Sequence, residues 1–382
     1  MRTSKTVNTI NSQYIIAGRK YIFIMLFMFC ALGFAQQEAK STPVKIAVIG
    51  LTHTHVHWIL GRPKTNDIEI VAIVEPNRDL AARYVAQHNL STDLLFDSID
   101  AMLEKVTPDA VTAFGNIFDH LKVVQIFAPF GIHVMVEKPL AISLDHAMDM
   151  KNLATKHNIH LLTNYETSWY ASHHKARTMI EEGNIGELRK IVAHDGHKGP
   201  EEIGVNNEFL VWLKDPKLNG GGAITDFGCY GVNLITWLKH GEKPVSVTAI
   251  TQTIKPDKYP NVDDEATIIL EFPKMQGIIQ ASWNWPIARK DLEIYGSEGQ
   301  IYCNNSSDIT YQLDEETDEE ALTLPDLAVP LNDPFATFAA VIKGDLILEP
   351  FDLTGLDNNM LVIEILEAAK KSAKTGTKVY LD

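Results

Sequence analysis

Two residues that can exchange protons, Asp226 and Tyr230, follow three successive glycines at positions 220–222. Without Cβ atoms, the backbone of such a turn can approach a ligand or another segment closely. If a helix begins near Asp226, the carboxylate and the phenol lie on one face of it, one turn apart. A carboxylate beside a phenol can orient it and change its pKa, which suits proton transfer. The alternative is a glycine-rich turn followed by an N-cap aspartate and a core tyrosine.

A lysine that could serve the same chemistry, Lys138, stands in the triplet Glu137-Lys138-Pro139 after a predicted strand at 131–136. Open α/β sheets bind ligands at the carboxyl ends of their strands, where this triplet falls. A lysine there can bond a substrate oxygen and lower the pKa of a neighbouring phenol. An ordinary surface loop is the alternative that position alone leaves open.

The elements that must position these residues fall into two groups. Apolar, β-branched runs predict strands at 44–50, 68–74, 109–114, 131–136 and 160–163, with helices between them. This alternation is typical of a doubly wound parallel sheet, so we expect an α/β Rossmann domain over residues 44–163. Later runs separated by Gly, Pro, Asn and Asp predict an α+β domain with a largely antiparallel sheet at 164–357, followed by a closing helix and strand at 358–382.

The turn after the first strand is where a dinucleotide would bind. The usual fingerprint is G-x-G-x-x-G with an acidic residue about twenty positions later, and only Gly50 remains of the three glycines. Thr52, His53 and Thr54 can offer side-chain donors and backbone N–H groups to phosphate. Glu75, at the end of the second strand, could hold the ribose hydroxyls, and a carboxylate there favours NAD over NADP. A Rossmann-like domain that no longer binds nucleotide is the alternative.

Histidines at positions 53, 55 and 57 raise the question of a metal ion. At this spacing the three cannot share one helix face. No cysteine or pair of carboxylates stands nearby in the sequence to complete a ligand set. We therefore expect no metal.

Composition limits the class of protein and its partners. The chain has 382 residues, of which 45% are hydrophobic and 22% charged, which is enough for two globular domains. A formal charge of -15 argues against a nucleic-acid partner, which would need a basic face. Basic residues followed by an apolar run at 21–34 predict a signal peptide over residues 1–35, because the run is short for a membrane span. We expect an exported, periplasmic protein with no stable membrane span after cleavage; an uncleaved anchor is the alternative.

Six motifs in order resemble the glucose–fructose oxidoreductase/inositol dehydrogenase (Gfo/Idh/MocA) family. They are the strand at 44–50, the triplet at 137–139, the turn at 183–186, the element at 220–228, the turn at 295–299 and the last helix with 375–379. The resemblance covers essentially all of the chain after the predicted signal peptide. It implies NAD or NADP as cofactor, hydride transfer on sugars or polyols, and an open C-terminal sheet that often joins subunits. We therefore expect an NAD(P)-dependent oxidoreductase of a small carbohydrate that forms a dimer or tetramer.

The resemblance also implies roles for particular residues. The family lysine falls on Lys138, the family aspartate on Asp226, and the position of the usual catalytic histidine on Tyr230. We expect Tyr230 to transfer the hydroxyl proton, Lys138 to orient the substrate and lower the pKa of the phenol, and Asp226 to position the pair. Cofactor contacts are expected at Gly50, Thr52, His53, Thr54, Glu75, Asn116, His120, Glu137 and Lys138.

Signals for the substrate and for competing functions are weaker. Trp283, Trp285 and Arg289 suit stacking on a sugar, and His197 could reach the same cleft, although core packing is the alternative for at least one tryptophan. Because free nicotinamide cofactor is scarce outside the cytoplasm, we expect it to be tightly bound and recycled. Two other functions stay open, namely redox-neutral glycoside cleavage through transient oxidation and carbohydrate binding without catalysis.

Overall fold

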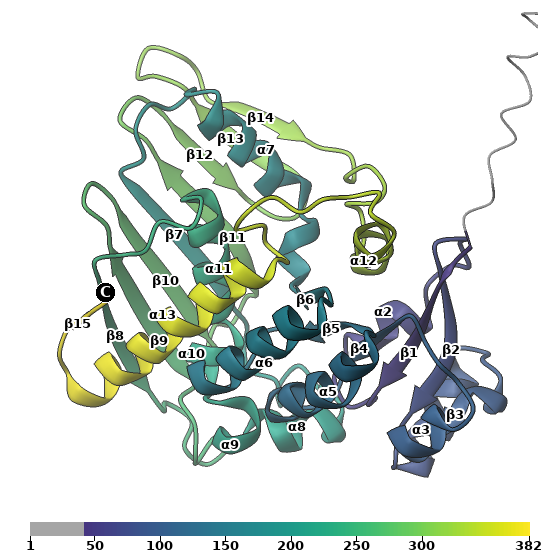
Figure 1. The fold of residues 1–382 in the computed structure, drawn as a ribbon. Coiled ribbons are helices and arrows are strands. Elements are labelled where there is room, and N and C mark those ends of the chain that lie inside the picture. Colours follow the sequence, from purple (N-terminus) through teal and green to yellow (C-terminus); the bar gives the residue numbers. More distant parts are fainter. Residues whose placement is uncertain (1–41) are drawn as a thin grey trace, which may run out of the picture. The chain divides into compact units, whose positions relative to one another are not determined.

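Two β-sheets organise the chain, and helices pack against each of them (Figure 1). The computed structural model describes residues 42–382, so the predicted signal peptide over residues 1–35 lies outside the described residues. Residues 43–382 form one compact unit. No helix in this described range is long and apolar enough to cross a membrane.

The first sheet is parallel, and its strand order within the described chain is β3-β2-β1-β4-β5-β6. The strand order reverses at β1, and open sheets bind ligands beyond the carboxyl ends of the strands at such a point. The elements of this region are β1 (Val44–Ile49), α2 (Val56–Leu60), β2 (Ile68–Val74), α3 (Arg78–Gln87), η1 (Thr92–Leu94), β3 (Leu95–Phe96), α4 (Ile99–Leu103), β4 (Ala110–Ala113), η2 (Ile117–Asp119), α5 (His120–Phe127), η3 (Ala128–Phe130), β5 (His133–Glu137), α6 (Leu144–His157), β6 (Leu161–Asn164) and η4 (Glu166–Trp169).

The second sheet has the order β14-β13-β12-β11-β7-β10-β9-β8-β15 among the described residues. Strands β7 and β10 pair in parallel, whereas the other neighbouring strands pair antiparallel. Its strands are β7 (Lys190–Gly196), β8 (Ser246–Gln252), β9 (Glu265–Glu271), β10 (Gln276–Ser282), β11 (Arg289–Tyr295), β12 (Gln300–Cys303), β13 (Asp308–Gln312), β14 (Glu320–Thr323) and β15 (Val379–Tyr380). The remaining helices are α7 (Ala171–Glu181), α8 (Asn207–Leu213), α9 (Pro216–Asn219), α10 (Ala223–Asp226), α11 (Gly228–Leu238), α12 (Pro334–Lys343) and α13 (Leu356–Thr375).

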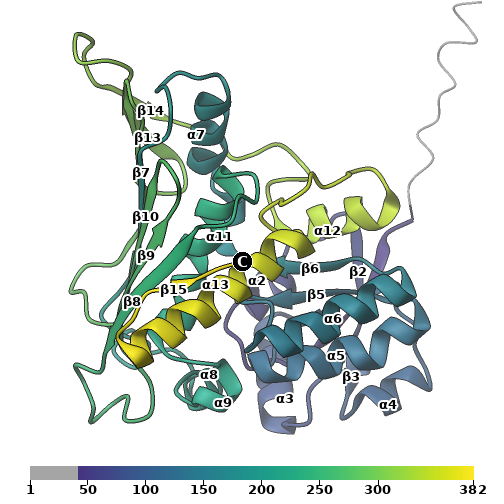
Figure 2. The same ribbon diagram turned by 60° about the vertical axis from the view of Figure 1, so that its left-hand side comes forward.

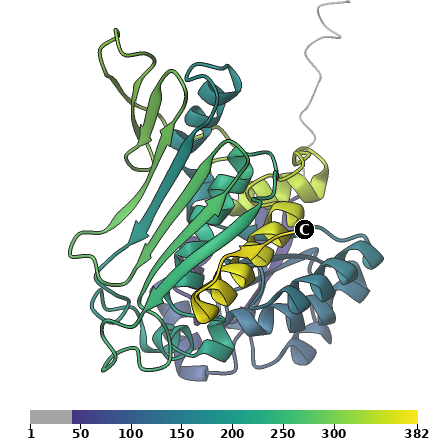
Figure 3. The same cartoon turned by 90° about the vertical axis from the view of Figure 1, so that its left-hand side faces the viewer.

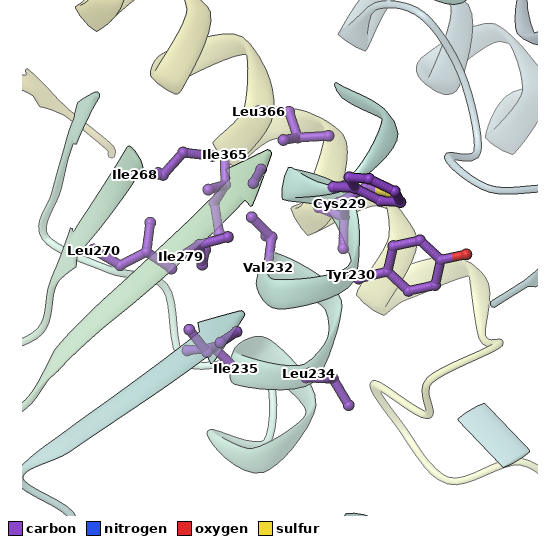
Figure 4. Close-up of a cluster of buried hydrophobic side chains, with 14 of the residues drawn as sticks. Cys229, Tyr230, Val232, Leu234, Ile235, Ile268, Leu270, Ile279, Ile365 and Leu366 are labelled. Atoms are coloured by element: carbon purple, nitrogen blue, oxygen red, sulfur yellow. The ribbon is translucent and has the colours of Figure 1, made fainter. Parts of the chain in front are cut away.

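Helices α7, α11 and α13 lie on one face of the second sheet (Figure 2). The opposite face carries no helix of the described chain (Figure 3). Val232, Ile235 and Tyr230 of α11 lie in one hydrophobic cluster with Ile279 of β10, and the ring of Tyr230 points away from Ile279 (Figure 4). A Cβ atom on Gly231 would lie 2.6 Å from Ile279, so glycine allows α11 to pack directly on the sheet.

Both predicted sheets are confirmed, but one helix joins a different core from the one expected. Helix α12 falls within residues 164–357, the range predicted for the second domain. Its Phe335 and Phe338 share a hydrophobic cluster with Ile46 and Phe114 of the first sheet region. The range 164–357 therefore includes a helix that completes the first core, because an apolar helix face does not reveal which sheet it covers.

Candidate active site

A cleft of about 610 Å³ lies where the carboxyl ends of β1 and β5 meet the end of β7 and helices α8, α10 and α11. It is formed within residues 43–382, which make one compact unit. The cleft brings together seven of the predicted site residues, namely His53, Thr54, Lys138, His197, Asp226, Tyr230 and Arg289.

A buried ion pair lines the cleft. The Nζ atom of Lys138 donates to Oδ1 of Asp226 at 2.6 Å and to the Asp226 carbonyl oxygen at 3.1 Å. The two side chains are only 5% and 8% exposed. Burial opposes charge on both groups, yet their mutual attraction raises the pKa of Lys138 and lowers the pKa of Asp226. Both groups are therefore charged at neutral pH, and the ammonium, which has three N–H donors, keeps one for a ligand.

Two ammonium groups lie near the ring of Tyr230, with Lys138 Nζ at 4.9 Å and Lys290 Nζ at 4.4 Å from the ring centroid. Burial nevertheless raises the pKa of Tyr230 well above its usual value, and the carboxylates of Glu166 and Asp195 raise it further. The net pKa of this phenol is therefore raised, because burial outweighs the lowering expected from the nearby Lys138 ammonium. The cations stabilise the ring through its π-face, and Tyr230 is a neutral phenol at pH 7.

The three glycines before the pair bring the chain close to another segment. Asp263 accepts hydrogen bonds from the backbone N–H groups of Gly222 at 2.9 Å and Ile224 at 2.7 Å through its carboxylate. A Cβ atom on Gly222 would lie 1.8 Å from the Asp263 carbonyl oxygen. Helix α10 ends at Asp226 and α11 begins at Gly228, so one helix does not carry both Asp226 and Tyr230 as expected. Both residues nevertheless line the cleft.

A second cavity of about 360 Å³ follows the carboxyl ends of β1, β2 and β4, where a Rossmann domain holds the adenosine half of a dinucleotide. Gly50, Asn116 and His120, three of the residues predicted to contact the cofactor, line it. Gly50 has φ +78°, and a Cβ atom there would lie 3.0 Å from the amide nitrogen of Gly115. The ring of His120 donates from Nδ1 to the Leu140 carbonyl at 3.1 Å, which leaves Nε2 buried without a partner among the described residues. The groove and this free acceptor fit a bound dinucleotide.

Two residues predicted to contact the cofactor are held by hydrogen bonds within the protein. The carboxylate of Glu75 accepts from the backbone N–H groups of Leu51 at 2.9 Å and Asn77 at 2.8 Å, and it does not line the groove. Its side chain holds the turn after β1 in place. Thr52 also turns inward, because its hydroxyl donates to the Phe114 carbonyl and accepts from the indole of Trp212 at 3.0 Å.

The histidines after β1 acquire a carboxylate that the sequence did not show. The Glu137 carboxylate lies 2.9 Å from Nδ1 of His55 and 3.9 Å from Nε2 of His53. Glu137 is distant in the sequence, so the absence of further ligands nearby in the sequence does not by itself exclude a metal at these three residues. However, Nδ1 of His53 accepts the backbone N–H of His55 at 3.1 Å, so the neutral ring carries its proton on the Nε2 that faces Glu137. With this proton on Nε2, His53 cannot bind a metal ion through that nitrogen, so the three residues form a hydrogen-bonded cluster.

The predicted sugar-stacking cluster separates in the fold. Trp283 is 0% exposed, and its indole N–H donates to Oδ2 of Asp226 at 3.1 Å. Trp285 packs against the backbone of Gly196, and neither tryptophan lines the cleft. Arg289 does line it, but pairs with Asp291 at 2.6 Å. Trp283 and Trp285 are therefore not placed to stack on a sugar in the cleft. Their position at a strand end in the sequence does not reveal toward which side of the sheet each side chain points.

No catalytic role is predicted from the sequence for three charged residues of the cleft. The pairing of β7 with β11 places Lys290 opposite Asp195, and Lys290 Nζ forms an ion pair with Glu166 at 2.6 Å. All three line the cleft with Tyr230. The alternating polarity of β11 predicts that Lys290 and Asp291 face opposite sides, but the strand register that brings Lys290 to Asp195 is not visible in the sequence.

Comparisons with known proteins agree with this architecture. Residues 44–165 match an oxidoreductase family described by its NAD-binding Rossmann fold, and residues 173–302 match the GFO/IDH/MocA C-terminal domain. The trans-1,2-dihydrobenzene-1,2-diol dehydrogenase of Xenopus laevis is 26% identical over 238 residues, which are 62% of this chain and 67% of that protein. The D-xylose 1-dehydrogenase (NADP(+)) of Haloarcula marismortui is 23% identical over 363 residues, covering 91% of this chain and 96% of that one.

A solved structure shares the fold. The aldose-aldose oxidoreductase from Caulobacter crescentus superimposes with a TM-score of 0.75 at 20% identity. The superposition covers 89% of this chain and 100% of that chain.

Proposed function

Since this chain belongs to the GFO/IDH/MocA family of oxidoreductases, which has an NAD-binding Rossmann fold, we propose that it oxidises a hydroxyl group of a sugar or polyol. The relatives that act on D-xylose and on a dihydrodiol support a small hydroxylated substrate. The observation that carries the proposal is the buried Lys138–Asp226 pair, which lines a cleft at the carboxyl edge of the first sheet. Open α/β sheets bind their ligands at this edge.

The residues along the groove would hold the cofactor. Gly50, Asn116 and His120 line the cavity for the dinucleotide, and Lys138 follows β5 in the adjoining cleft. When bound, NAD supplies the acceptor for the hydride that leaves the carbinol carbon. We further propose that the cofactor stays bound between turnovers, which suits an exported enzyme.

Each side chain of the cleft has a separate part in this proposal. The third N–H of Lys138 donates to the substrate oxygen and stabilises the negative charge that develops there as the hydroxyl loses its proton. Asp226 keeps that ammonium charged and in place. Tyr230, whose hydroxyl bonds no other described residue, donates a hydrogen bond to the substrate and does not act as the base.

A direct experiment begins with protein purified without added nucleotide. Mass spectrometry should detect bound NAD(H), and addition of D-xylose, D-glucose or myo-inositol should change the absorbance of the nicotinamide. Tyr230→Phe should lower the rate of sugar oxidation by about 10²-fold, the cost of one lost donor to the developing oxyanion. Tyr380→Phe, which changes an exposed tyrosine, is the matched control. Protein that neither holds nor binds a nicotinamide nucleotide would refute the proposal.

We also infer export and self-association. If residues 1–35 are a cleaved signal peptide, mass spectrometry of protein from a periplasmic extract should give a chain that begins at Gln36. Ile250 and Ile269, 67% and 39% exposed, lie on the uncovered face of the second sheet, and a second copy could cover them. Light scattering should then give a molar mass that is a multiple of the mass of the mature chain. A molar mass equal to that of one chain would refute self-association.

A further inference from the structure

Oxidation of a hydroxyl group must deliver a proton to a base, and most groups of the cleft cannot take it. Burial keeps the phenol of Tyr230 protonated by raising its pKa well above the usual value. The ammonium groups of Lys138 and Lys290 hold their protons, since carboxylates raise the pKa of each against the effect of burial. The carboxylates of Asp226 and Glu166 are weak bases, because these same lysines lower their pKa values despite burial.

Four carboxylates of the described chain line the cleft, namely Glu166, Asp195, Asp226 and Asp291. Asp195 alone among them has a raised pKa, because burial outweighs the attraction of Lys290 and Lys138. It stands at the end of β7, is 4% exposed and lines the cleft. Its Oδ2 atom is buried without a hydrogen-bond partner among the described residues. A ligand, a function or an ordered water usually accounts for such an unpaired buried oxygen.

The position of Asp195 relative to Tyr230 follows from strand alternation. Asp195 lies two residues after Ala193, so both point to the same face of the sheet. Helix α11 packs on that face, because a Cβ atom on Gly231 would lie 3.0 Å from Ala193. Tyr230, adjacent to Gly231, and Lys290, opposite Asp195 on β11, line the same cleft.

We propose that Asp195 is the general base that takes the hydroxyl proton of the substrate; this inference rests on the proposed oxidation. The C–H bond of the carbinol breaks and its electron pair leaves as hydride to the oxidised nicotinamide. The O–H bond breaks, its proton goes to Oδ2 of Asp195, and a carbonyl group remains. In the direction of reduction, protonated Asp195 returns the proton to the alkoxide oxygen.

The charges around Asp195 determine the pH dependence. Burial raises the pKa of Asp195 to about 7, Lys290 and Lys138 act to lower it, and Glu166 and Asp226 act to raise it. The phenols of Tyr170 and Tyr230 and the imidazole of His197 also line this part of the cleft. Oxidation needs the carboxylate, so its rate should fall about tenfold per pH unit below that pKa. Reduction needs the carboxylic acid, so its rate should fall above it.

A first test measures ionisation and needs no turnover. Infrared difference spectra of the full chain, recorded without added nucleotide, should show a carboxylic acid that ionises near pH 7, close to the pKa of about 7 for Asp195. Asp195→Asn should remove this signal. Asp308→Asn, which changes a carboxylate on β13 outside the cleft, should keep it. The inference would be overturned if the wild type showed no carboxyl signal that titrates near neutral pH. It would also be overturned if that signal persisted in Asp195→Asn.

The second test is kinetic. The substrate is whichever of D-xylose, D-glucose and myo-inositol the wild type oxidises. At pH 8 the Asp195→Asn enzyme should oxidise it about 10²- to 10⁴-fold more slowly. The fall in rate at low pH, the acidic limb of the pH–rate profile, should disappear in this variant. Unchanged NAD affinity of the variant shows that it is folded. Lys290→Gln removes a cation that favours the Asp195 carboxylate, so it should move the acidic limb to higher pH.

The outcomes separate the two claims. If the wild-type protein binds NAD but oxidises none of the three probes, the proposed function is refuted. The role of Asp195 as the base of that reaction is then refuted as well. An active wild type whose rate and acidic limb are unchanged in Asp195→Asn refutes only the role of Asp195. The same holds if Lys290→Gln leaves the limb in place or moves it to lower pH.

Discussion

Replacing Asp226 by asparagine should destabilise the protein strongly, because Lys138 would stay buried without its counter-charge. The two side chains are 5% and 8% exposed, and their charged atoms are 2.6 Å apart. Breaking a buried pair by removing one partner costs about 3–5 kcal/mol, a large share of the roughly 5–15 kcal/mol that stabilises a typical protein. With a denaturant slope of about 3 kcal/mol/M, the urea midpoint should fall by about 1 M or more.

The pH dependence of that loss distinguishes a charge effect from a packing effect. In the wild type, the raised pKa of Lys138 gives stability that is present below about pH 10.4 and lost as pH rises through the folded pKa. The lowered pKa of Asp226 gives stability that is present above about pH 3.9 and lost as pH falls through the folded pKa. The contribution of the pair is therefore constant around neutrality.

In Asp226→Asn the sign for Lys138 reverses. Burial without a carboxylate depresses the lysine pKa in the folded state, so the unfolded chain binds more protons and stability rises with pH. The deficit measured by urea unfolding should shrink between roughly pH 7 and pH 10. A second substitution, Lys138→Met, should recover part of the loss, because it removes the unpaired buried charge.

An exposed ion pair provides the control. Lys243 and Glu364 are 2.8 Å apart but 46% and 26% exposed, so Glu364→Gln should leave the urea midpoint almost unchanged. The reasoning is refuted if Asp226→Asn is as stable as this control. It is also refuted if the deficit does not change with pH, or if Lys138→Met deepens it.

Two further substitutions test how the pair is held. Trp283→Phe removes the indole donor to Asp226 Oδ2 at 3.1 Å, so urea unfolding should show a loss of about 1.5–3 kcal/mol, the contribution of a hydrogen bond to a charged group; wild-type stability would contradict this contact. Gly222→Ala should prevent accumulation of folded protein, because the new Cβ would lie 1.8 Å from the Asp263 carbonyl oxygen. Gly376→Ala is the control, where a Cβ meets nothing within 4 Å although the backbone has φ +68°; equal yields of the two variants would contradict the close approach.

Local sequence patterns were sufficient for the parts of the fold that depend on neighbouring residues. The apolar runs before Gly50 and before Glu137 predict buried strands, and the parallel sheet follows from their alternation with helices. Lys138, Asp226 and Tyr230 come together in the cleft, as the resemblance to the family implies.

The remaining features depend on contacts between distant segments. His55 and Glu137 meet across 82 positions, and Lys290 faces Asp195 only because β11 pairs with β7 in one register. Glu75 has the residue type and place expected of a ribose ligand, but two backbone N–H groups turn its carboxylate inward. Neither the direction of a side chain nor the burial that raises the pKa of Tyr230 can be read from residue spacing.

The central claim is that the cleft around Lys138 and Asp226 oxidises a sugar or polyol hydroxyl with NAD. Its most direct test is a single turnover of protein loaded with NAD, mixed with D-xylose, D-glucose or myo-inositol and followed by the absorbance of reduced nicotinamide. The wild type should form reduced nicotinamide with at least one of these probes, and Lys138→Met should be slower by about 10²-fold or more. No reduction with any probe, or an equal rate in Lys138→Met, would contradict the account.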